Sequence, residues 1–201
     1  MSNSSQENSP PESLVDRSVF EGRRILIGIC GGIAAYKVAS VVSALAQADA
    51  EVIVAMTVSA TRFVTPLTFQ ALSGRSVFTS QWDQFEAADP QHVRLATSLD
   101  AALVAPCTMN SLARIAGGFA DDAVTSVLSA IDRKVTPVLL APSMNAEMWE
   151  QPATRRNLDL VQADGYRLIE PGVGWQACRR SGAGRLPEPE TLLRAISKVL
   201  G

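Results

Sequence analysis

The amino-acid sequence predicts a single-domain α/β protein whose doubly wound parallel sheet lies between two layers of helices. Short apolar runs alternate with helix-like stretches along the chain, which is the pattern of strand–helix–strand units. The runs are apolar throughout instead of alternating with polar residues, as expected of parallel strands covered on both faces. With 201 residues, the chain is long enough for one domain with a sizeable core.

The order of elements follows from this pattern. Strands are expected at RRILIGI (23–29), EVIVAM (51–56), AALVAP (101–106), TPVLLAP (136–142) and YRLIEP (166–171). Helices are expected over 34–47, 66–73, 109–131 as one or two helices, 152–164 and 189–200. Such a Rossmann-like or flavodoxin-like sheet binds ligands at the carboxyl ends of its strands. Residues 1–21 are polar, rich in serine and proline and unlike a signal peptide, so we expect a disordered tail before a domain over 22–201.

Composition excludes several classes of protein. The net charge of −2 gives no reason to expect nucleic acid or an anionic membrane surface as a partner. No apolar run reaches the roughly 18 residues that cross a bilayer, so we expect a cytoplasmic protein. Three cysteines lie far apart without a CxxC pair, and there is one histidine, so neither a disulfide framework nor a metal site is expected.

The first expected strand runs into the segment GICGGIAAYK. Gly31 and Gly32 allow a tight turn and close approach to a ligand, and the next helix offers its first amides to an anion. Packing alone also explains such glycines. The segment is not the GxGxxG fingerprint, and no acidic residue ends the second strand, which disfavours NAD. Without a GxxxxGK[ST] loop, ATP is disfavoured too, and a mononucleotide with one phosphate fits best.

Two later strands end alike, as APCTMN and APSMN. Thr108, Asn110 and Ser111 cluster where a helix begins, and since one cap suffices, the others are free to face a ligand. In APSMNAEMW, capping explains Ser143, whereas Asn145 can donate and accept and so suits a carboxylate or amide rather than a cap. If the two strands are neighbours, these endings form the walls of a pocket.

Two further residues are candidates for chemistry. His92 precedes a strand and follows an acidic loop, and it is either a catalytic base or an ordinary histidine. Cys178 lies in GVGWQACRRSGAGRLPEP, a glycine-rich segment that we interpret as a mobile flap. Its neighbouring arginines favour a thiolate, although an incidental exposed cysteine fits equally well. Cys107 is interpreted as a buried small apolar residue.

Together these segments resemble the flavin-dependent cysteine decarboxylases, above all the phosphopantothenoylcysteine decarboxylases of coenzyme A biosynthesis, over about Arg23 to Leu200. The most specific match is the P-x-M-N-x-x-M-W signature, here Pro142, Met144, Asn145, Met148 and Trp149. GGIAAYK is similar to the flavin-phosphate loop, TVSATRF (57–63) to T-x-x-A-x-x-F, and CTMNSLARIAGG to S-A-N-T-x-A-K-I-A-x-G. His92 falls on the family's active-site histidine, and ACRRSGAGR resembles A-C-G-x-x-G-x-G-R.

The resemblance implies flavin mononucleotide (FMN) as cofactor and 4'-phosphopantothenoylcysteine as substrate, which is converted to 4'-phosphopantetheine and CO2 by a carboxy-lyase. Oxidation of the thiol-bearing carbon gives a thioaldehyde, from which the carboxylate leaves as CO2. His92 would act as base and Cys178 would donate a proton in the final reduction. Substrate contacts are expected from Asn145, Met144 and Arg185. Cofactor contacts are expected from Gly31, Gly32, Ile33, Thr57, Phe63, Thr108, Met109, Asn110, Ser111 and Ala141.

The chain departs from the family pattern at four positions. Arg94 and Ser98 replace a glutamate and a tryptophan, Arg179 replaces the glycine after the flap cysteine, and Leu186 replaces a methionine. These changes bear on the flap and on substrate recognition, not on the flavin site.

Three alternative functions remain, namely a peptidyl-cysteine decarboxylase, a flavin prenyltransferase and a non-catalytic regulatory flavoprotein. The frame around Cys178 favours the coenzyme A enzyme over the first, and Pro-Ser-Met-Asn in place of Arg-Glu-Thr-Pro counts against the second. A short tail and intact His92, Asn145 and Cys178 count against the third. The family further implies a homotrimer or trimer-based assembly with flavin sites between subunits, and we expect a separate phosphopantothenate–cysteine ligase.

Overall fold

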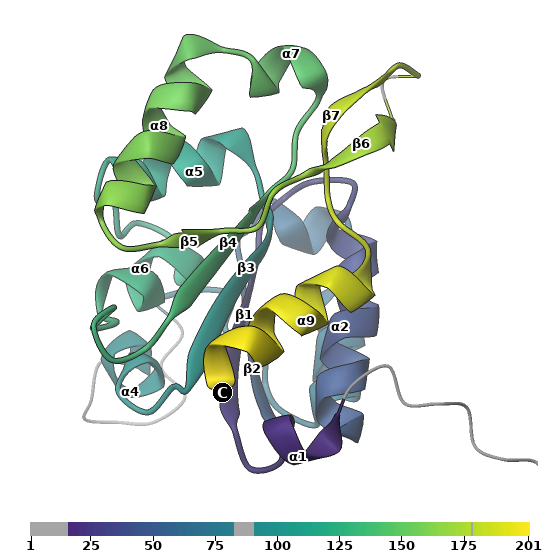
Figure 1. Ribbon diagram of the computed structural model, residues 1–201. Coiled ribbons are helices and arrows are strands. Elements are labelled where there is room, and N and C mark those ends of the chain that lie inside the picture. Colours follow the sequence, from purple (N-terminus) through teal and green to yellow (C-terminus); the bar gives the residue numbers. More distant parts are fainter. Residues whose placement is uncertain (1–15, 83–90, 178) are drawn as a thin grey trace, which may run out of the picture.

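The computed structural model describes residues 16–82, 91–177 and 179–201, and it confirms the doubly wound α/β class (Figure 1). The parallel sheet contains β1 (Arg24–Ile29), β2 (Glu51–Met56), β3 (Ala101–Cys107), β4 (Val138–Pro142) and β5 (Arg167–Leu168). Its strand order is β2-β1-β3-β4-β5, so the chain reverses its winding between β1 and β3. In such sheets the crevice outside the carboxyl ends of these two strands is where ligands bind.

Helices cover both faces of the sheet, as Figure 1 shows. One layer contains α1 (Arg17–Phe20), α2 (Ala35–Gln47), α3 (Pro66–Ser73) and α9 (Pro189–Leu200). The other contains α4 (Gln91–Ala96), α5 (Met109–Ala116), α6 (Ala123–Ser129) and α8 (Pro152–Ala163). The short helix α7 (Ala146–Trp149) leads from β4 to α8, a 3-10 helix (Ala60–Arg62) follows β2, and a separate antiparallel hairpin joins β6 (Gly172–Trp175) to β7 (Ser181–Arg185).

Burial on both faces explains the continuous apolar strands. Along β1, Ile25 and Ile27 pack into the core beneath α2 and α9. Leu26, between them, packs into the opposite core beneath α5, α6 and α8. Since successive side chains of a strand point to opposite faces, every position of such a strand is apolar.

The structure decides between two expectations for one helical stretch and shortens one expected strand. The helical stretch 109–131 is two helices, because the chain turns at Gly118, whose φ is +71°, before Asp122 starts α6 with a capping box. The strand expected over 166–171 pairs with β4 only at Arg167 and Leu168. It is the edge strand, and Pro171 has no backbone N–H to extend the ladder.

The N-terminal boundary also differs from the expectation. The described chain begins at 16, and α1 is already part of the domain because Phe20 is only 1% exposed within the core that contains α2 and α9. Asp16 caps this helix by accepting a hydrogen bond from Ser18 N at 3.0 Å. The predicted tail over 1–21 therefore extends too far toward the domain, and residues 1–15 lie outside the described chain.

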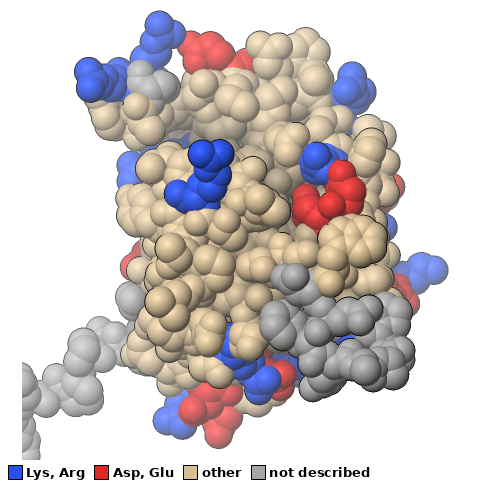
Figure 2. Space-filling model, turned by 180° about the vertical axis from the view of Figure 1, so that it is seen from behind, with Lys and Arg blue, Asp and Glu red and all other residues tan. Residues whose placement is uncertain are grey.

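The surface carries charges of both signs without one dominant patch on the face seen in Figure 2. Small groups of acidic and basic side chains are separated by broad areas with no Lys, Arg, Asp or Glu. No helix in the described part of the chain is long and apolar enough to span a membrane.

Candidate functional site

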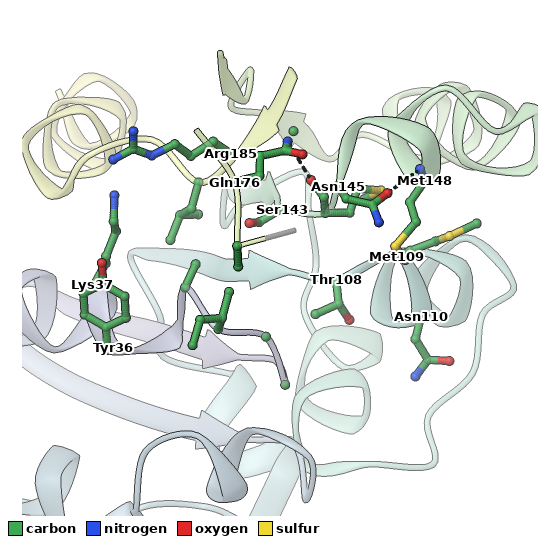
Figure 3. A pocket seen from close by; sticks show the side chains of 18 of the residues that line it. Tyr36, Lys37, Thr108, Met109, Asn110, Ser143, Asn145, Met148, Gln176 and Arg185 are labelled. Atoms are coloured by element: carbon green, nitrogen blue, oxygen red, sulfur yellow. Dashed lines mark hydrogen bonds between the residues drawn. The ribbon is translucent and has the colours of Figure 1, made fainter. Parts of the chain in front are cut away.

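A cavity of about 720 Å³ lies at the carboxyl end of the sheet (Figure 3). Its walls are the loop after β1, the start of α5, the loop between β4 and α7, and the β6–β7 hairpin. Ligand sites typically have volumes of about 300 to 1,000 Å³. The cavity is thus large enough for a cofactor or substrate and sits where the strand order predicts a ligand.

The first wall is the turn from β1 into α2. A Cβ atom on Gly31 would lie 2.4 Å from the Cβ of Ser59, so packing against the loop after β2 requires a glycine there. At the following helix start, Ala34 supplies no side-chain cap. Ala35 N and Lys37 N already donate to Gly32 O at 3.0 Å and to Ala34 O at 3.1 Å, so only the other amides of this turn can bind an anion. Both the packing and the ligand explanation of the two glycines apply.

The second wall is the start of α5, where the three clustered polar residues divide their roles. Thr108 is the N-cap, because its Oγ1 accepts from Ser111 N at 3.3 Å and donates to Ser111 Oγ at 3.1 Å. Ser111 itself is buried and does not line the cavity. Thr108, Met109 and Asn110 do line it.

Asn145, on the third wall, caps α7, contrary to the expectation from sequence. Its Oδ1 accepts from Met148 N at 2.8 Å, and its extended backbone is the usual N-cap conformation. Ser143, the expected cap, instead lines the cavity, and its N–H donates to Cys107 O at 2.9 Å across the neighbouring strand end. Capping uses only the amide oxygen of Asn145, so the NH2 group can still donate to a ligand in the cavity.

The β6–β7 hairpin, which lies within the segment interpreted as a flap, is held against this third wall. Gln176 is 8% exposed, and its Oε1 accepts from Ala146 N at 3.1 Å. Its Nε2 donates to Ala183 O at 2.7 Å and to Met144 O at 3.5 Å. One side chain thereby joins both hairpin strands to the loop that carries Asn145.

Glycines bring the hairpin into direct backbone contact with that loop. A Cβ on Gly184, whose φ is +109°, would lie 2.3 Å from Met144 O, and Met144 N donates to Gly184 O at 2.9 Å. At the hairpin turn, Arg180 Nη1 forms an ion pair with Glu147 Oε1 of α7 at 2.7 Å. The glycines of this segment thus have a docking role.

Most of the expected binding residues meet at the cavity. Those that line it are Gly31, Gly32, Ile33, Thr108, Met109, Asn110, Met144, Asn145 and Arg185. The cavity of the single chain does not include Thr57, Phe63, Ser111 or Ala141. Thr57 is buried and its Oγ1 accepts from Ala60 N at 3.2 Å, Ala141 is buried in β4, and Phe63 is exposed beyond the 3-10 helix.

The two expected catalytic residues are not placed together by the described chain. His92 lies on α4, which precedes β3 and occupies the end of the sheet opposite the cavity (Figure 1). It is on a helix, an element that was not among those expected from the sequence. Cys178 lies outside the described residues, while its neighbour Ala177 lines the cavity.

The other cysteines are buried, which confirms the interpretation of Cys107. Burial raises the pKa of the Cys30 thiol to about 12 and raises that of Cys107 well above its ordinary value. Neither thiol is ionised near neutral pH, so neither is a nucleophile.

Sequence reasoning missed Lys37, Trp175 and Gln176, all of which line the cavity. Lys37 belongs to the GGIAAYK segment and Gln176 lies two residues before Cys178, so both were close to recognised motifs. Their orientation depends on the paths of α2 and the hairpin, which sequence spacing does not give. Among the four departures, Leu186 is buried against the cavity, and Ser98 accepts a hydrogen bond from the side chain of Arg24.

The fold and the cavity define a doubly wound α/β protein with a ligand crevice at its topological switch point. The profile of the family described as Flavoprotein matches residues 16–201. The chain therefore belongs to the flavoprotein family.

Named relatives and solved structures agree with this assignment. The chain is 42% identical over 180 residues to the coenzyme A biosynthesis bifunctional protein CoaBC of Bacillus subtilis. The matched region covers 90% of this chain and 44% of that protein. The corresponding protein of Mycolicibacterium smegmatis is 42% identical over 178 residues, with 89% and 42% covered. The chain thus spans less than half the length of these relatives.

Two solved structures share the fold over nearly their whole length. The FMN-dependent cysteine decarboxylase SpaF is 32% identical, with a TM-score of 0.76 and coverage of 90% of this chain and 97% of that one. A PPC decarboxylase variant complexed with pantothenoylaminoethenethiol is 28% identical, with a TM-score of 0.79 and coverage of 88% and 97%.

Proposed function

We propose that this chain is an FMN-dependent decarboxylase that converts 4'-phosphopantothenoylcysteine to 4'-phosphopantetheine and CO2 in coenzyme A biosynthesis. The observation that carries the proposal is the position of Asn145, within the P-x-M-N-x-x-M-W signature, on a cavity wall against the hairpin whose two strands flank Cys178 in the sequence. Similarity to CoaBC proteins and to the PPC decarboxylase structure supports this substrate.

The cavity residues fit a flavin mononucleotide. The turn into α2 has no side-chain cap, and those of its amides that make no backbone hydrogen bond can bind the single phosphate. The ends of β1 and β3 are the switch point of the sheet. Ile33, Met109 and Leu186 provide apolar surface for a ring system, while Thr108 and Asn110 provide polar groups for its edge. Phe63, one of the expected cofactor contacts that the cavity does not include, is exposed and so is available to a neighbouring subunit.

The chemistry that bound FMN supplies is reversible hydride exchange with the substrate carbon that carries the thiol. Asn145 would orient the substrate carboxylate through its amide NH2, so that CO2 leaves from a fixed geometry. His92 would accept the thiol proton, and Cys178 would donate a proton when the enethiol becomes the saturated product. The buried Gln176 would keep the Asn145 loop and the hairpin together during these steps.

We further propose a trimer-based assembly in which His92 of one copy completes the cavity of another. The position of α4 at the opposite end of the sheet supports this arrangement, since one chain does not bring His92 to its own cavity. Exposed apolar side chains near the carboxyl ends of β1 and β2 offer a surface for a neighbouring copy, namely Ile33, Tyr36, Val58, Phe63 and Leu67. A phosphopantothenate–cysteine ligase, on the same polypeptide or another, must supply the substrate.

The test is incubation of the FMN-loaded protein with 4'-phosphopantothenoylcysteine, followed by mass analysis of products and measurement of CO2. We expect CO2 and saturated 4'-phosphopantetheine, with the flavin oxidised at the end. Accumulation of the oxidised enethiol would show that Cys178 does not complete the cycle. A protein that binds no FMN would refute the proposal.

The resemblance to SpaF favours a second candidate, decarboxylation of a peptide that ends in cysteine. The same assay with such a peptide distinguishes the two. Faster turnover of the peptide than of the phosphorylated conjugate would assign the chain to the peptidyl-cysteine decarboxylases.

A further inference from the structure

The charged groups that line the cavity are all cationic within the described part of the chain. Lys37, in the first turn of α2, and Arg185, the last residue of β7, are the only Lys, Arg, Asp or Glu residues among its described lining. Figure 3 shows the Lys37 ammonium and the Arg185 guanidinium facing each other, well separated in that view from Asn145. The cavity therefore has a cationic end, which lies away from the Asn145 amide that is proposed to bind the carboxylate.

A third residue holds the two cations in place. Glu188, which precedes α9, binds Lys37 Nζ through Oε1 at 2.8 Å and Oε2 at 2.9 Å, and its Oε1 also accepts from Arg185 Nη2 at 2.7 Å. The side chain of Lys37 is only 12% exposed. The ammonium of Lys37 lowers the pKa of the Glu188 carboxyl, which therefore stays ionised near neutral pH. Two positive charges and one negative charge leave a net positive charge at this end.

We propose that Lys37 and Arg185 form a subsite for a phosphate monoester, namely the phosphate of the substrate. The inference rests on the proposed function, since 4'-phosphopantothenoylcysteine carries a carboxylate at its cysteine end and a phosphate at its other end. Asn145 holds the carboxylate and the cationic pair holds the phosphate. The resemblance implies that Arg185 contacts substrate; the structure adds Lys37 and assigns the group that both bind.

The two side chains suit the three terminal oxygens of a phosphate monoester. The planar guanidinium of Arg185 can donate two parallel hydrogen bonds, and the ammonium of Lys37 is a compact charge with three donors. Glu188 orders both cations before the ligand arrives, which lowers the entropy lost on binding. A peptide that ends in cysteine has no phosphate for this subsite, so the pair selects the phosphorylated conjugate.

The experiment compares 4'-phosphopantothenoylcysteine with pantothenoylcysteine, which lacks the phosphate, in the FMN-loaded protein. Lys37→Gln and Arg185→Gln each remove one cation, and we expect each to lower kcat/KM for the phosphorylated substrate about tenfold, as for loss of a charge-assisted hydrogen bond. The kcat/KM for pantothenoylcysteine should change less than about twofold, because that substrate makes no contact with the pair. Arg194→Gln, which removes an exposed arginine of α9, is the matched control and should alter neither value.

Equilibrium binding separates this subsite from the catalytic proposal. In calorimetry, 4'-phosphopantetheine should bind the wild-type protein more tightly than pantetheine does, and the difference should vanish in the double Lys37→Gln/Arg185→Gln variant. This result supports the subsite even if no substrate is decarboxylated. Equal losses for both substrates, or an undiminished phosphate preference, overturn it. Weaker FMN binding with an unchanged preference also overturns it, because the pair then holds the flavin phosphate.

Discussion

The fold uses only one of the two polar atoms of the Asn145 side-chain amide. Its oxygen caps α7 through Met148 N, and its nitrogen remains available to a ligand in the cavity. The cap fixes the side chain in one position, which is what a residue that orients a carboxylate requires.

Asn145→Asp separates the helix cap from the proposed contact with the substrate carboxylate. Aspartate caps a helix as well as asparagine does, so the fold, the thermal stability and FMN binding should be retained. The variant loses the NH2 donor and places a negative charge against the substrate carboxylate, so we expect decarboxylation to fall roughly 100-fold or more. Steady-state CO2 release measures the effect, and normal turnover would refute the role of Asn145.

Asn145→Ala serves as the control, because it removes the cap as well as the donor. It should lose activity and also about 1 kcal/mol of stability, measured by denaturant unfolding. If Asn145→Asp were destabilised as much as Asn145→Ala, the activity loss would reflect a displaced loop.

Arg179 occupies a backbone conformation that disfavours side chains. Its φ is +62°, in the left-handed region, and the resembled family has glycine at this position. Arg179→Gly should stabilise the hairpin turn by up to about 1 kcal/mol, which limited proteolysis and urea unfolding would register.

Arg179→Ala removes the same guanidinium but keeps the Cβ atom, so it should show none of this gain. Equal effects of the alanine and glycine variants would attribute the change to the lost charge instead of the backbone.

At the scale of elements, the β6–β7 hairpin and the β4–α7 loop behave as one unit because Gln176 bonds to both. Its Oε1 accepts from Ala146 N and its Nε2 donates to Ala183 O, with Gly184 allowing close backbone contact. Under the proposed function, this unit carries the carboxylate contact and the proton donor Cys178.

Gln176→Glu keeps the shape and the acceptor for Ala146 N but places an oxygen against two carbonyl oxygens. Losing these donor bonds in a buried position costs about 1–3 kcal/mol, so the equilibrium constant for docking of the hairpin should fall about fivefold or more. We expect FMN binding to persist while the ratio of oxidised enethiol to saturated product rises, as measured by mass analysis.

Arg180→Gln is the matched control at the hairpin turn. It breaks only the exposed ion pair with Glu147, which contributes little to stability. The product ratio should stay at the wild-type value. A change in Arg180→Gln equal to that in Gln176→Glu would mean that general loosening, not the Gln176 contacts, controls the reduction step.

The sequence predicted the elements whose side chains face a core. The limits of β1 to β4, α2, α3, α8 and α9 lie within about two residues of the expectation, because burial on both faces or on one helical stripe leaves a regular pattern. The four-residue helix α7 and the six-residue helix α4 are too short for such a pattern. The hairpin was missed because its exposed valine and tryptophan lie among glycines that local propensity assigns to a loop.

The sequence also predicted the site residues that lie at strand ends but not those placed by long-range contacts. Residues at strand ends, such as Thr108 and Asn145, could be found because parallel strands bring their carboxyl ends together. Lys37 and Gln176 could not, because their roles depend on contacts with Glu188 and Ala146 that lie 151 and 30 positions away. The cap at Asn145 was missed because its four-residue helix leaves no periodic signal.

At the scale of the whole molecule, the proposed base and the cavity stand at opposite ends of the sheet. His92 is on α4, which lies on the side of the amino ends of the strands, whereas Asn145 lines the cavity at the carboxyl ends (Figure 1). Exposed apolar side chains that follow β1 and β2, among them Ile33 and Phe63, are available for contact with another copy. Under the proposed function, a working site would then take groups from two chains.

Complementation between two inactive variants tests this arrangement. His92→Asn removes the base and Asn145→Asp removes the carboxylate contact, so each variant alone should be inactive. When the two are unfolded together and refolded as mixed oligomers, a site that takes His92 from one chain and Asn145 from another is intact in about a quarter of cases under random assembly. We therefore expect about 25% of wild-type CO2 release. If one chain supplied both His92 and Asn145 to each site, every site would contain one substituted residue. The mixture would then stay as inactive as the two variants alone.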